Sequence, residues 1–115
     1  MALYECTFIV RQDATTQEVE KITSNLSNVI TEKSGKIHKS ENWGLRSLAY
    51  EIKRNKKGHY IMLQIEANND SMKEMERRMK LTEDVIRHLT IKVDSLNKED
   101  SIIMKERNKE TEGAA

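Results

Sequence analysis

Four cations stand close together in the middle of the chain, at Lys53, Arg54, Lys56 and Lys57, with Asn55 among them. Exposed positive charge of this kind can bind the phosphates of a nucleic acid, a contact that adds affinity but little sequence discrimination. The same composition is typical of a solvated turn without a ligand. From the residues alone both interpretations stay open.

A second group of candidates combines aromatic side chains with one further cation. Tyr4, Tyr50 and Tyr60, with Met62, are predicted on strands and on the sheet face away from the helices. A tyrosine there can stack on a base or simply pack against its neighbours. Arg87, at the start of the last predicted strand, could reach either RNA or an acidic group.

The second predicted strand carries a candidate partner surface made of Glu41, Trp43, Leu45 and Arg46. Charged side chains on an edge strand often prevent unwanted pairing between sheets. The same edge could instead receive a protein partner with complementary charges, and the two roles are compatible.

Catalytic and metal-binding patterns are weak. Cys6 has no second cysteine to pair with, and His38, His59 and His88 lack the spacing of a metal site. We therefore expect no metal, no cofactor, no small-molecule substrate and no enzymatic activity.

Composition limits the class of protein. The 115 residues are 37% hydrophobic and 34% charged, with a net charge of +1, which suits one compact domain with a surface of mixed sign. A single cysteine favours a reducing cytoplasm. The N-terminus lacks the pattern of a signal peptide, and no stretch approaches the roughly 18 apolar residues of a membrane span, so neither secretion nor a membrane is expected.

The first half of the chain predicts a strand, a helix and the beginning of a hairpin. Residues 3–11 are rich in β-branched and aromatic types. A helix with a capping box at 15–18 follows, and Gly35 is its expected C-terminal cap. Residues 36–67 predict two antiparallel strands joined by a four-residue turn at 55–58, and Gly44 predicts a bulge in the first of them.

The second half predicts a helix capped by residues 69–71, whose methionines fill the core, and a last strand at 85–93. The order strand, helix, strand, strand, helix, strand predicts an α+β, ferredoxin-like split β-α-β sandwich. It would hold a four-stranded antiparallel sheet with two helices on one face and its first and third strands inside. We assign residues 1–93 to this domain and expect 94–115 to be a mostly disordered tail.

The run from Trp43 to Ile52 carries the most specific motif: Gly44, Arg46, Leu48, Ala49, Tyr50 and Ile52 follow one another as Gly-x-Arg-x-Leu-Ala-Tyr-x-Ile. This run resembles the signature of the bacterial family of sixth small-subunit ribosomal proteins. The similarity extends over residues 3–93.

The resemblance implies a cytoplasmic, structural role in the ribosome. Members of this family bind the central domain of small-subunit ribosomal RNA as a heterodimer with the eighteenth small-subunit protein. The resemblance also implies RNA contacts for Tyr4 and Arg87. At position 2, however, this chain has Ala2 in place of the arginine that many members carry. A nearly neutral protein would then bind RNA chiefly alongside a basic partner.

Other functions are possible on the same order of elements. An RNA-recognition motif would need aromatic residues where His59 and Ile61 stand. An acylphosphatase-like hydrolase would need a glycine-rich loop in place of 12–15, which carries Asp13. A ferredoxin-like oligomerisation or ligand-sensing module without RNA binding stays open, because fold alone does not fix function.

Overall fold

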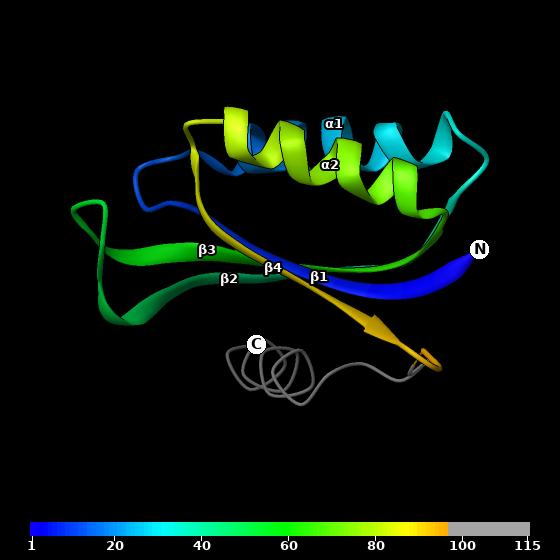
Figure 1. Cartoon of the computed structure of the whole chain (residues 1–115). Coiled ribbons are helices and arrows are strands. Elements are labelled where there is room, and N and C mark those ends of the chain that lie inside the picture. The colour runs from blue at the N-terminus through cyan, green and yellow to red at the C-terminus, as the bar shows by residue number, and fades with distance from the viewer. Residues whose placement is uncertain (97–115) are drawn as a thin grey trace, which may run out of the picture.

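The computed structural model describes residues 1–96 and has the predicted order of elements (Figure 1). Its strands and helices are β1 (Ala2–Arg11), α1 (Thr16–Thr31), β2 (Lys36–Ile52), β3 (Asn55–Ala67), α2 (Asn69–Leu81) and β4 (Val85–Val93). The antiparallel sheet has the order β2-β3-β1-β4, and both helices cover one face. The ferredoxin-like prediction is confirmed, with β1 and β3 inside. Of the predicted tail, residues 97–115 lie outside the described residues.

The core lies between the sheet and the helices. Alternate residues of the central strands face the helices, and the three α2 methionines fill the gap, as predicted. The fully buried side chains include Phe8, Val10, Leu63, Ile65, Met75 and Met79. This packing leaves the opposite face of the sheet without a helix over it.

Helix ends follow their local chemistry, with two corrections. The Thr15 hydroxyl accepts a hydrogen bond from the Glu18 amide at 3.1 Å, as the capping box predicts. The second helix is capped by Asn68, whose side chain accepts from the Ser71 amide at 2.8 Å, and not by residues 69–71. After α1, the left-handed residue is Ser34 (φ 66°), so the prediction that Gly35 caps the helix was wrong.

Gly35 is required for a different reason. A β-carbon at this position would lie 2.6 Å from Ile30 Cγ2 and 3.0 Å from the Glu66 carbonyl oxygen. The glycine therefore permits close packing between the end of α1 and β3.

An arginine at the end of β1 joins three parts of the fold. Arg11 forms ion pairs with Asp84 at 2.6 Å and with Asp13 and Glu18 at 2.8 Å each. The hydrogen bond that Arg11 donates to Asp13 lowers the pKa of that carboxyl group, and the Arg11 amide also donates to the Asp84 carbonyl. The start of β4 is thus fixed beside the β1–α1 loop. None of the helices within residues 1–96 is long and apolar enough to cross a bilayer.

Candidate nucleic-acid and partner interface

The predicted basic hairpin tip exists, but its turn lies earlier than expected. Ile52 pairs with Asn55, so the turn residues are Lys53 (φ 45°) and Arg54 (φ 68°), both with positive φ as in a type I′ turn. The four-residue turn predicted at 55–58 was wrong. Residues 55–58 belong to β3, and a β-carbon on Gly58 would lie 2.3 Å from Ile9 Cγ2.

Asn55 explains why the turn closes there. Its Nδ2 donates to the carbonyl oxygens of Ile52, at 3.3 Å, and Lys53, at 3.0 Å. Its Oδ1 accepts from the Gln12 amide at 2.9 Å, and Gln12 Oε1 accepts from the Lys57 amide at 3.3 Å. One buried amide therefore holds the basic tip against the β1–α1 loop.

The cations predicted to bind RNA, namely Lys53, Arg54, Lys56, Lys57 and Arg87, are all exposed. The tip lies at the end of the sheet opposite the N-terminus, and β4 begins at that same end (Figure 1). The structure therefore gathers these side chains at one end of the molecule. Their contact with RNA stays a prediction.

Arg87 is held by an aromatic side chain from the far end of β2. Its Nη1 donates a hydrogen bond to the Tyr50 hydroxyl, and its guanidinium carbon lies 5.7 Å from the centre of the Tyr50 ring. β2 and β4 are opposite edges of the sheet, so this contact spans the face that lacks helices. The sequence placed Tyr50 on this face but gave no sign of the contact with Arg87.

Tyr4 occupies a different place from the one expected. It shares the helix-facing side of β1 with Cys6 and Phe8 and packs half-buried against the core, so its prediction on the helix-free face was wrong. Tyr4 pairs with Lys92, whereas Arg87 pairs with Ile9, five positions further along β1. At about 3.3 Å per residue the two are roughly 17 Å apart along the strand. An RNA contact of Tyr4 would thus be separate from the end of the molecule where the predicted RNA-binding cations lie.

The predicted partner surface lies on an edge strand, since β2 pairs only with β3 among the described strands. Arg46 and Leu45 are exposed, and half of the Leu45 side chain is accessible. Trp43 packs edge-on against Tyr60, with ring centres 6.2 Å apart, beside the predicted bulge, where Gly44 has φ 81°. These positions suit contact with another protein.

Glu41, which the sequence placed in the candidate partner surface, is buried in the structure. Only 3% of it is accessible, and one carboxylate oxygen accepts from Trp43 Nε1 at 3.0 Å. This hydrogen bond fixes the orientation of the Trp43 ring. Direct contact of Glu41 with a partner stays a prediction.

The face without helices carries an apolar groove of about 370 Å³ that sequence reasoning missed. Ile9, Trp43, Tyr50, Tyr60 and Leu89 line it, with Arg87 at its border. Leu89, Ile91 and Val93 alternate along β4 and so share one face of the sheet. The structure turns this face away from the helices, with Leu89 59% and Ile91 50% exposed.

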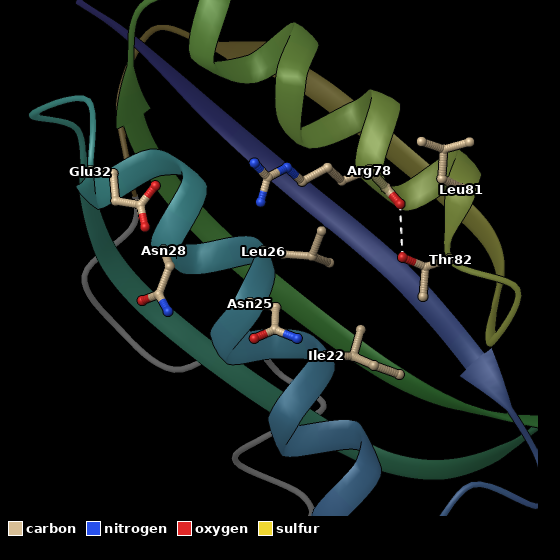
Figure 2. A pocket seen from close by; sticks show the side chains of 8 residues that line it. All are labelled: Ile22, Asn25, Leu26, Asn28, Glu32, Arg78, Leu81 and Thr82. Carbon is tan, nitrogen blue, oxygen red and sulfur yellow. Dashed lines mark hydrogen bonds between the residues drawn. The ribbon is translucent and has the colours of Figure 1, made fainter.

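A second groove, of about 410 Å³, lies between the two helices and contains none of the predicted site residues (Figure 2). Asn25 and Asn28 of α1 border it together with the C-cap residue Glu32, and Arg78 and Leu81 border it from α2. Arg78 is already engaged, because Arg77 and Arg78 both hydrogen-bond Glu74 and lower its pKa to about 2. No group of acidic, histidine or cysteine side chains within residues 1–96 could hold a metal ion.

Comparison with known proteins identifies relatives of the whole described domain. The family model "Ribosomal protein S6" matches residues 3–92. A protein of Paramagnetospirillum magneticum named small ribosomal subunit protein bS6 is 49% identical over 96% of this chain and 76% of its own length. The protein of that name from Rickettsia prowazekii is 46% identical over 96% and 91%.

A solved structure agrees with the sequence comparisons. The crystal structure of 30S ribosomal protein S6 from Thermotoga maritima superposes with a TM-score of 0.76 at 26% identity. It covers 99% of this chain and 98% of the other.

Proposed function

Since the chain belongs to the ribosomal protein S6 family, we propose that it is a structural component of the small ribosomal subunit that binds small-subunit ribosomal RNA together with the eighteenth small-subunit protein. Its place would be the ribosome in the cytoplasm, and its role would be non-enzymatic. The observation that carries the proposal is the family match over residues 3–92, which covers nearly all of the described domain.

Two neighbouring surfaces, which meet at Arg87, support binding of two macromolecules. The basic end, defined as Lys53, Arg54, Lys56, Lys57 and Arg87, offers exposed positive charge suited to RNA phosphates. The groove on the helix-free face and the neighbouring edge of β2 offer apolar area suited to a protein. A net charge of only +1 favours weak RNA binding by the chain alone, so we expect a basic partner to add much of the attraction.

The two binding events should be coupled. Tyr50 lines the apolar groove and also bonds to Arg87 of the basic end. A partner that fixes Tyr50 would also fix Arg87, which lowers the cost of ordering that cation on RNA.

A titration of a small-subunit ribosomal RNA fragment spanning the central domain, with and without the partner, tests this proposal. We expect weak, strongly salt-dependent binding by the chain alone and much tighter binding by the pair. Equal binding with and without the partner would contradict the cooperative role.

A charge reversal tests the proposed docking edge. Arg46→Glu should weaken association with the partner while leaving the unfolding midpoint close to that of the wild type, because Arg46 is exposed. Lys36→Glu, at the other end of the same strand, is the matched control. Normal heterodimer formation by Arg46→Glu would remove this edge from the docking surface.

The alternative function is a ferredoxin-like module that oligomerises or senses a ligand without RNA. The exposed Leu89 and Ile91 favour it, because a second copy could cover them. Light scattering of the isolated chain distinguishes the two: a stable oligomer that binds neither RNA nor the partner supports the alternative, and a monomer argues against it.

A further inference from the structure

Building on the proposed RNA-binding function, we propose that Lys53, Lys80 and Arg87 form one phosphate-binding subsite for the RNA backbone. They border a hollow of about 310 Å³ at the end of the sheet where the β2–β3 turn meets the start of β4. Lys80 was not among the residues that the sequence suggested for RNA binding.

Three elements far apart in the chain bring these cations together. Lys53 belongs to the turn after β2, Lys80 to the last turn of α2, and Arg87 to β4. All three side chains are exposed at the surface. A phosphate in the hollow would therefore meet positive charge from several directions, an arrangement that no single segment could provide.

The floor and the charge of the hollow suit an anion. Met79, Val85 and Ile86, which also line it, are at most 7% exposed, so part of the wall is apolar and screens charge poorly. Among the described residues that line the hollow, none is acidic. An anion would therefore meet positive charge and no carboxylate in the lining of the hollow.

The backbone at the turn supports a functional reason for Lys53. Both Lys53 and Arg54 have positive φ, a conformation that asparagine and glycine adopt more readily than long side chains do. Asn55 fixes this turn through its hydrogen bonds to the Ile52 and Lys53 carbonyls. A lysine kept in an unfavourable conformation beside two other cations indicates that its charge is used.

Arg87 is held in place by Tyr50 and keeps further donors that a phosphate can use. Its bond to the Tyr50 hydroxyl uses one N–H of Nη1, and a guanidinium has five N–H donors in a fixed plane. The remaining donors can bind two phosphate oxygens at once, a geometry that arginine offers and lysine does not. The RNA backbone is therefore the ligand class that fits the three groups.

The test measures binding of the full chain, with the partner present, to the central-domain RNA fragment over a range of salt concentrations. Lys53→Ala and Lys80→Ala should each weaken binding about 3- to 10-fold near physiological salt, and the double variant should lower the salt slope by about one. The combined loss should be smaller than the product of the single losses, because both side chains serve one phosphate. Lys73→Ala, on an exposed position of the same helix, should bind like the wild type.

Inorganic phosphate gives an independent readout. In a titration of the full chain followed by NMR, the Arg87 Nε–H signal should shift and saturate in the wild type and in Lys73→Ala, and shift far less in Lys53→Ala/Lys80→Ala. Sodium chloride at matched ionic strength controls for screening. A shift of the same size in the double variant would overturn the subsite.

The outcomes separate this inference from the function on which it rests. If Lys80→Ala and Lys73→Ala bind RNA equally while the wild-type pair binds tightly, the subsite is wrong and the proposed function stands. If Lys80→Ala instead weakens association with the partner in the absence of RNA, the hollow receives an acidic protein segment, which also overturns the subsite. If the wild-type pair does not bind the RNA fragment, the proposed function itself fails.

Discussion

At the scale of single residues, Asn55 has the widest effect on the basic end. It is only 9% exposed, and its three hydrogen bonds join the turn, β3 and the β1–α1 loop. A buried amide of this kind is stabilising only while its partners remain satisfied.

Asn55→Ala should lower the free energy of unfolding by about 1–3 kcal/mol, because the Gln12 amide loses its acceptor and the turn loses two donors. Urea denaturation measures the change. Asn55→Asp keeps the acceptor for Gln12 but places a carboxylate oxygen against the Ile52 and Lys53 carbonyls, so it should also be less stable than the wild type. Equal stability of all three proteins would show that the amide does not fix the turn.

Cys6 is also buried, but we expect it to have no chemical role. It is fully buried on β1, and burial raises the pKa of its thiol from 9.0 to about 11. The neutral thiol is a poor nucleophile, so we expect a structural side chain and not a redox site.

This pKa predicts a pH dependence of stability. Below about pH 9 the thiol is protonated in both the folded and the unfolded chain, and stability is unaffected. As the pH rises from about 9 to 11, the unfolded thiol ionises first, so the stability advantage of wild type over Cys6→Ala should shrink by about 2–3 kcal/mol. Urea midpoints of both proteins under reducing conditions check it, and parallel pH profiles would contradict it.

At the scale of elements, the β2–β3 turn combines strain with charge. A residue with a side chain in the left-handed region costs roughly 1–2 kcal/mol relative to glycine, and two such residues follow each other here. Natural type I′ turns favour Asn-Gly at these positions. The charge of Lys53 and Arg54 is therefore kept at some expense of stability.

Replacing Lys53 by Asn and Arg54 by Gly should raise the free energy of unfolding by about 1 kcal/mol or more. The same double variant should weaken RNA binding, because two cations are lost. Lys53→Ala/Arg54→Ala removes the charges without relieving the backbone and should bring no gain in stability. A less stable Asn-Gly variant would mean that this turn is not strained.

At the scale of the whole molecule, function depends on where the charges lie, since their sum is only +1. The sheet places positive charge at one end, apolar area on the helix-free face and the core under the helices. The partner and the RNA that we propose would then bind to neighbouring surfaces of one domain.

Removing two cations from the basic end tests this distribution. Lys56→Ala/Lys57→Ala should weaken RNA binding by the heterodimer. The slope of the logarithm of the binding constant against the logarithm of the salt concentration should become shallower by about one to two. Lys21→Ala/Lys33→Ala removes the same charge from α1 and its C-terminal loop and should leave the slope unchanged. An unchanged slope in the first variant would take Lys56 and Lys57 out of the RNA surface.

The sequence by itself determined the order of elements, the α1 cap at Thr15, the bulge at Gly44 and the family resemblance, because these depend on neighbours within a few residues or on a continuous motif. It placed the hairpin turn three residues late. Gly58 is required by close packing against Ile9 and not by a turn, whereas Asn55 closes the turn through its side-chain hydrogen bonds.

Only the tertiary structure decided which side chains meet. Strand alternation groups Tyr4 with Cys6 and Phe8 but cannot say that this face lies under the helices. The contact of Tyr50 with Arg87, and the hollow shared by Lys53 and Lys80, join residues from separate elements. Their positions follow from the register and twist of the whole sheet, which no local pattern records.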